Sequence, residues 1–142
     1  MAAEVKAVVT RKGQEDTGTG QSGGCIRVTG VGPGVTAATS KIWFGKVSNE
    51  PGYRSLPHHH GEAETGGYVL KGVGRIYFGE NYSEFFDMSE GDFVFVPPNW
   101  PHVEVNMSTT EELVWLTTRT PDNIVVNLPD VDDSTLAGFR RV

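Results

Sequence analysis

Three of the chain's four histidines stand side by side at residues 58–60, where their spacing suits metal binding. Successive side chains of an extended segment point to opposite faces, so His58 and His60 share one face and His59 takes the other. Two imidazoles placed in this way form a chelating pair. The carboxylate of Glu64 follows closely enough to reach the same ion if a small turn intervenes. Imidazole and carboxylate together suit Zn, Fe, Ni or Mn.

A further ligand has to come from a distant part of the chain, and His102 is the one remaining histidine. It follows the Pro-rich stretch VPPNWP and begins a segment with the composition of a strand. Alternation along that strand puts Glu104 on the same face as His102. This carboxylate could face the cavity and act as an acid or base. Alternatively, a bend after His102 turns it to solvent.

Three Trp, four Tyr and seven Phe are too many for one pocket, so most of the aromatic residues should lie in the core. Two of them have positions that suit a substrate pocket. Trp100 comes just before His102 and could cover the cavity, and Tyr68 could turn its hydroxyl inward. The alternatives are a surface position for Trp100 and a core position for Tyr68. Arg54 and Lys46 could pair with an anionic substrate group, although such residues are more often solvated.

Short apolar segments bounded by turn residues predict an all-β chain. Strands are expected at residues 41–47, 67–70, 75–78, 85–88, 93–96, 102–107, 113–118 and 123–127, after a first strand within residues 1–10. The polar, Gly-rich residues 11–24 should form a mobile loop. A short helix is expected only at residues 132–142, where Asp132 or Asp133 could cap it. These elements close into either a sandwich or a barrel-like jelly roll.

Composition narrows the class of protein further. The 142 residues fit one domain, and the net charge of −6 argues against nucleic acid or an anionic membrane as a partner. One cysteine, Cys25, excludes a disulfide framework, and no histidine lies near it in sequence, so a catalytic thiol is not expected. We expect a cytoplasmic protein, because the sequence shows neither a signal peptide nor an apolar run of membrane-spanning length.

Two stretches of the sequence resemble the paired motifs of the cupin superfamily. The first is carried by Gly52, His58, His60, Glu64 and Gly72, and the second by Gly91, Pro97, His102 and Asn106 within GDFVFVPPNWPHVEVN. Two departures stand out. Asn99 replaces the usual glycine, and Gly72 comes one residue late after Glu64. Some cupins instead carry the glutamate at the position of Thr65.

The resemblance implies a single-domain double-stranded β-helix, a jelly roll. Residues 41–128 would form the core barrel. Residues 1–40 would form an N-terminal strand and Gly-rich loops of the same domain, and residues 129–142 would form a C-terminal tail. One divalent metal would be held inside by His58, His60, Glu64 and His102; in a shifted register His59 would replace Glu64. Each imidazole should have its second nitrogen fixed by a partner that the sequence does not identify. Cupins commonly form homodimers, often by exchanging an N-terminal strand, here residues 1–10.

Cupins run many reactions, so the fold does not decide the function. The chain resembles, in size and form, the stand-alone cupin cyclases of bacterial aromatic polyketide pathways, which belong to antibiotic biosynthesis. The leading expectation is a Lewis-acid cyclisation of a small, carbonyl-rich, apolar or aromatic substrate, with Zn favoured and Glu104 or Glu64 moving the proton. An Fe(II) dioxygenase that cleaves a C–C bond is the main alternative. A sugar isomerase or epimerase and a non-catalytic ligand-binding cupin are the others.

Overall fold

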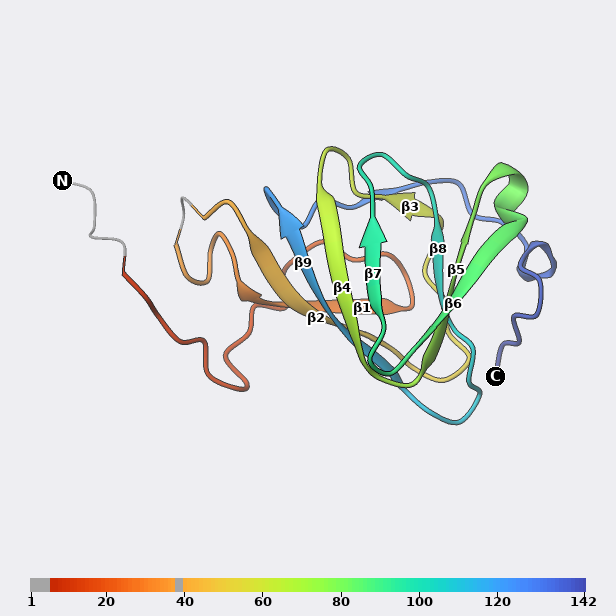
Figure 1. Ribbon diagram of the computed structural model, residues 1–142, viewed down its shortest axis with the longest axis horizontal. Coiled ribbons are helices and arrows are strands. Elements are labelled where there is room, and N and C mark those ends of the chain that lie inside the picture. The colour runs from red at the N-terminus through yellow and green to blue at the C-terminus, as the bar shows by residue number, and fades with distance from the viewer. Residues whose placement is uncertain (1–5, 38–39) are drawn as a thin grey trace.

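Short β-strands dominate the computed structural model, which describes residues 6–37 and 40–142 (Figure 1). The strands are β1 (Cys25–Val31), β2 (Trp43–Asn49), β3 (His58–His59), β4 (Glu64–Lys71), β5 (Val73–Phe78), β6 (Glu84–Ser89), β7 (Phe93–Val96), β8 (Val103–Asn106), β9 (Leu113–Thr120) and β10 (Val126–Asn127). Two short 3-10 helices, η1 (Glu80–Tyr82) and η2 (Asp133–Thr135), complete the described elements. In this part of the chain no helix is long and apolar enough to cross a membrane.

The strands form antiparallel sheets that pair segments far apart in the sequence. The largest sheet has the order β1-β2-β9-β4-β7 and faces a three-stranded sheet, β6-β5-β8. The strands β10 and β3 pair separately at one end of the barrel (Figure 1). This arrangement confirms the predicted all-β jelly roll.

Alternation along β9 divides the barrel interior into two ends. Its inward residues run from Leu113 and Trp115 to Thr117 and Arg119, and all four are buried. The first two belong to the apolar core, together with inward residues of β2, β4, β5 and β7. The last two lie at the polar end. The same strand therefore contributes to the core at one end and to a polar interior at the other.

Glycine makes room for the large indole ring of Trp43 inside the barrel. A Cβ at Gly45 would lie 2.4 Å from the ring of Trp43 and 2.3 Å from the carbonyl oxygen of Val28. The ring itself donates a hydrogen bond of 2.6 Å from Nε1 to the hydroxyl of Thr29. Any larger residue at position 45 would therefore displace either the indole or the neighbouring strand.

The C-terminal tail packs on the outer side of the three-stranded sheet. Leu136 joins Tyr77, Val103 and Val105 in a second apolar cluster. The guanidinium of Arg54 pairs with Asp130 and Asp133, and it also donates to the carbonyl oxygens of Ser55 and Val131. Arg54 is therefore a structural residue and not a substrate ligand, and Lys46 is exposed on β2.

Most expected strands are present, but several expectations were wrong. Residues 6–10 form no strand, and the rest of the expected first strand lies outside the described residues. The strands β1 and β3 were not anticipated, because glycine surrounds the first and the second has only two residues. The expected helix shrinks to η2, which Asp132 caps by accepting from the backbone N–H of Ser134. Several aromatic residues expected in the core are exposed, including Phe93 and Phe95 on β7.

Candidate metal centre

Four side chains converge at the polar end of the barrel: those of His58, His60, His102 and Glu104. One ligand atom from each lies within 4.8 Å of the others, and all four residues are buried. Backbone pairing brings the two histidine segments together, because His58 and His102 each donate their N–H to the other's carbonyl oxygen, at 3.0 and 2.9 Å. His60 shares the face of His58 through alternation, as predicted.

Backbone carbonyl groups fix the orientation of all three imidazoles. The Nδ1 atoms of His58, His60 and His102 lie 2.7, 2.7 and 2.8 Å from the carbonyl oxygens of Leu56, Ile124 and Trp100. A carbonyl oxygen only accepts, so each Nδ1 carries a hydrogen and each ring turns its Nε2 toward the centre. These carbonyl groups are the partners that the sequence could not identify.

The centre brings hydrogen-bond acceptors unusually close together. The Oε1 atom of Glu104 lies 3.3 Å from Nε2 of His58 and 3.3 Å from Nε2 of His102. Each of these contacts needs a proton or a metal ion between the two atoms. Ligands about 2.1 Å from a single ion lie roughly 3–3.5 Å apart, so the observed separations fit one metal ion. The four residues could therefore hold one metal.

Burial and neighbouring charges keep His58, His60 and Glu104 in the protonation states that a metal requires. Burial lowers the pKa of His58 to about 4. Burial and the charge of Arg119 lower the pKa of His60 further. Burial alone would raise the pKa of Glu104, but the charge of Arg27 and the close contacts with His102 and His58 outweigh it and hold that pKa well below its usual range.

The structure corrects the fourth ligand expected from the sequence. Glu64 is exposed at the start of β4, and alternation turns its neighbour Thr65 into the barrel instead. It therefore lies outside the group, both as a ligand and as a catalytic carboxylate. His59 is also outside, with Nδ1 accepting the N–H of Gly61 at 2.9 Å. Glu104 replaces both candidates, on the inward face that alternation from His102 predicted.

Both carboxylate oxygens of Glu104 are engaged. Oε1 faces the histidines, and Oε2 accepts a hydrogen bond of 2.9 Å from the thiol of Cys25. The thiol is buried, and burial raises its pKa far above the usual range, so it stays protonated and serves as a donor. Glu104 is consequently better placed to hold a metal than to exchange protons with a substrate.

Two arginines, which the sequence analysis missed, lie beside the histidines. Nη2 of Arg27 is 3.3 Å from Nε2 of His58 and 3.4 Å from Oε1 of Glu104. Nη2 of Arg119 is 3.3 Å from Nε2 of His60. Alternation would have turned both inward, but β1 was not predicted and the strand predicted at residues 113–118 stopped one residue short of Arg119.

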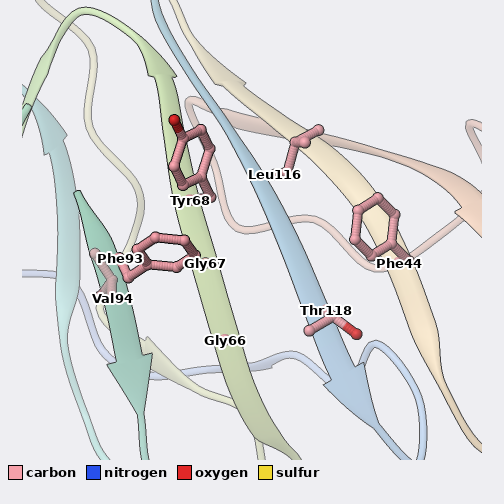
Figure 2. Close-up of a pocket in the computed structure, with 8 residues that line it drawn as sticks. All are labelled: Phe44, Gly66, Gly67, Tyr68, Phe93, Val94, Leu116 and Thr118. Carbon is pink, nitrogen blue, oxygen red and sulfur yellow. The ribbon is translucent and has the colours of Figure 1, made fainter. Parts of the chain in front are cut away.

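The two pocket aromatics take different places. The ring of Trp100 stacks on that of His102, with centroids 5.5 Å apart and planes at 27°, so it covers one side of the centre as expected. Tyr68 does not reach the centre. It lies with Phe44, Phe93 and Leu116 in a groove of about 340 Å³ on the outer face of the large sheet (Figure 2).

Two loops meet beside Arg119 and His60. Asn123 accepts from Nη1 of Arg119 at 3.1 Å and donates to the hydroxyl of Thr19 at 2.7 Å. Asn127 donates to the carbonyl oxygen of Gln21 at 3.2 Å. The end of the Gly-rich segment expected to be a mobile loop is thus joined to the segment that carries the Ile124 carbonyl group.

Comparison with solved structures supports the fold. A mutant of oxalate decarboxylase from Bacillus subtilis aligns with a TM-score of 0.64 and 22% sequence identity. The alignment covers 80% of this chain and 30% of the decarboxylase chain. The formate complex of Lactobacillus farciminis oxalate decarboxylase aligns with a TM-score of 0.64 at 20% identity over 74% of this chain and 31% of its own. This chain thus spans under a third of those enzymes.

A third structure has a size closer to that of this chain. It is an uncharacterized conserved protein with a double-stranded β-helix domain from Klebsiella pneumoniae, with a TM-score of 0.61 at 17% identity over 75% of this chain and 85% of its own. No curated protein matches the sequence. The family model described as "Cupin domain" matches residues 45–119, more than half of the chain. The chain therefore belongs to the cupin family, and its inward His58, His60, His102 and Glu104 could bind one metal ion.

Proposed function

We propose that this cupin is a metal-dependent enzyme that acts on a small carbonyl compound without net redox change. The observation that carries the proposal is the convergence of three histidine nitrogens and a carboxylate oxygen of Glu104, all within 4.8 Å of one another, which suits one cation. Three imidazoles and one carboxylate would hold the ion. When bound, it would supply Lewis-acid polarisation of a substrate oxygen.

The protein's own residues would orient the ligands and exclude water. The carbonyl groups of Leu56, Trp100 and Ile124 hold the three rings, and the thiol of Cys25 holds Glu104. The ring of Trp100 shields one side of the centre. Such fixed and buried polar groups need little reorganisation during a reaction.

Cyclisation of a polyketide remains a finer prediction within this class of reaction. The residues around the centre are charged and polar, which favours a smaller and more polar substrate than the aromatic one expected from the sequence. Zn suits non-redox chemistry. Mn is an alternative, because the Bacillus subtilis oxalate decarboxylase that shares the fold has Mn(II) centres.

An Fe(II) dioxygenase would use the same ligands and is the second candidate. Elemental analysis of protein purified without added metal, combined with oxygen uptake in the presence of a diketone, separates the two. Zn or Mn without oxygen consumption supports the proposal. Bound Fe with oxygen consumption replaces it with the dioxygenase.

The test of metal binding itself compares two adjacent histidines. His60→Ala should lose most of the bound metal, because it removes one Nε2 from the group, whereas His59→Ala should retain about one ion per chain. Equal metal content in both variants, or none in the native protein, would refute the proposed function.

We also propose that the protein forms a homodimer, through the outer face of the large sheet. There Phe93, Phe95 and Phe44 are 82%, 60% and 42% exposed, and exposed aromatic side chains are typical of interface cores. A second copy is the favoured occupant, because symmetric homodimers are the commonest assemblies of small proteins. The cytoplasmic location likewise stays a prediction.

A further inference from the structure

The two arginines beside the candidate metal group are incompletely satisfied. The Nε atoms of Arg27 and Arg119 are buried and have no hydrogen-bond partner among the described residues. Burying a charged donor without an acceptor is costly, so such groups in a native protein require an explanation. The hydroxyl of Thr65, which faces the barrel on the strand next to Arg119, is also buried and unpartnered.

Arg54 provides a matched comparison within the same chain. It is also buried, but its Nε and both Nη atoms donate to two aspartates and two carbonyl oxygens. A buried arginine with a structural role in this fold therefore has all of its nitrogens occupied. Arg27 and Arg119 differ because each has a free Nε and an Nη2 that faces a histidine.

The charges at this end of the barrel do not balance. Among the buried residues that the structure describes there, the two guanidinium groups face one carboxylate, that of Glu104. Arg27 lies 3.4 Å from this carboxylate, whereas Arg119 has no carboxylate partner within the described part of the chain. A divalent metal would add two further positive charges. Only an anion brought from outside would offset them.

Metal binding would also free a donor. Nη2 of Arg27 and Nη2 of Arg119 now contact the Nε2 atoms of His58 and His60. A lone pair that binds a metal no longer accepts a hydrogen bond, so Nη2 of Arg119 would need a new acceptor beside the ion. Nη2 of Arg27 would keep Oε1 of Glu104, at 3.4 Å. The planar guanidinium group suits the two oxygens of a carboxylate.

We infer that Arg119, assisted by Arg27, binds the carboxylate of a small keto acid whose carbonyl group faces the metal position. This inference rests on the proposed function and names its substrate class. Arg119 is the main receptor because it lacks a counter-charge, and Trp43 supports its guanidinium with Cζ 5.3 Å from the ring centroid. The apolar or aromatic substrate expected from the sequence would leave the charge of Arg119 unpaired.

The experiment compares two probes of similar shape by calorimetry, pyruvate and the uncharged 2,3-butanedione, on metal-loaded and on chelator-treated protein. We expect pyruvate to bind at least about tenfold more tightly than butanedione, as one charge-assisted pair allows. Arg119→Gln should abolish the difference, and Arg119→Lys should retain part of it. The native protein alone already tests the charge preference, so a variant that fails to fold does not end the test.

The outcomes separate this inference from the proposed function. Normal metal content with pyruvate bound no more tightly than butanedione would overturn the inference and leave the metal enzyme standing. A preference for pyruvate that depends on Arg119 in a protein that takes up no metal would support the inference and contradict the proposed function. A preference that is unchanged in a folded Arg119→Gln variant would also overturn the inference.

Discussion

The polar end of the barrel interior and the outer face of the large sheet reverse the usual distribution of side chains. Inside, two arginines, three histidines and a glutamate are fully buried, whereas outside Phe93 is 82% exposed. Both regions are built from the same strands, because β9 turns Arg119 inward and Leu116 outward. Neither arrangement favours folding of an isolated chain. On the proposals above, each region would be completed by something outside the chain, an ion with its substrate inside and a second copy of the protein outside.

The largest effect is expected from Glu104. Glu104→Gln removes the negative charge that offsets Arg27 and a metal ion, so metal affinity should fall at least about 100-fold. Mutation of residues that only hydrogen-bond to metal ligands already lowers metal affinity by up to about 100-fold, and loss of a ligand itself should cost no less. Glu64→Gln is the control and should leave the affinity unchanged, because Glu64 is exposed. Calorimetric titration of the chelator-treated proteins with Zn measures the metal affinity of both variants. An equal loss of metal affinity in both variants would show that Glu64 also contributes to the metal site.

Acid should destabilise the metal-free protein through its buried histidines. The folded-state pKa of His58 is about 4 and the pKa of His60 is also lowered, so the unfolded chain takes up protons first as the pH falls below about 6.5. Stability contributed by neutral burial is thus present above pH 6.5 and lost progressively toward pH 4. Urea midpoints between pH 7.5 and 5, where carboxylates stay ionised, should fall for the native protein and fall less for His58→Gln.

A smaller effect is expected from the thiol that holds Glu104. Cys25→Val removes the hydrogen bond to Oε2 at similar size, and metal affinity should fall about tenfold, as for other groups that orient ligands. Cys25→Ser restores a donor and should recover part of the loss. If valine and serine behave alike, the loss reflects packing in the apolar core and not orientation of the carboxylate.

The outer face should affect assembly and leave the centre alone. Phe93→Ser removes a large exposed ring and should shift a dimer toward monomer in light scattering, with unchanged metal content. Glu62→Ser, a change at another exposed residue, is the control. A native protein that is monomeric at every concentration would refute the proposed homodimer.

Much of the fold and most of the centre could be predicted from alternation and motif spacing. His58, His60 and His102 lie together as expected, and Glu104 faces inward, because period-two alternation survives in short strands. The prediction of Glu64 as a ligand was wrong because the turn after His60 places Thr65 inward and Glu64 outward. The position of Gly72, one residue later than in the family motif, is consistent with this shift of one residue. Arg27 and Arg119 were missed because recognising them requires strand ends, which local sequence defines poorly.

The outer aromatic face could not be predicted for a different reason. In a strand that alternates Phe and Val both faces are apolar. Hydrophobicity therefore does not say which of the two residue types faces the core. In β7 the valines Val94 and Val96 point inward and the phenylalanines point outward. Tyr68 was misplaced in the same way, since alternation from Thr65 puts it on the outer face (Figure 2).

The most direct test of metal binding is anomalous diffraction from a crystal of the protein, collected at the absorption edge of the metal found by elemental analysis. We expect one strong peak per chain, within about 2.0–2.4 Å of Nε2 of His58, His60 and His102 and of Oε1 of Glu104. A peak beside Glu64, or no peak between the histidines in protein that contains stoichiometric metal, would contradict it.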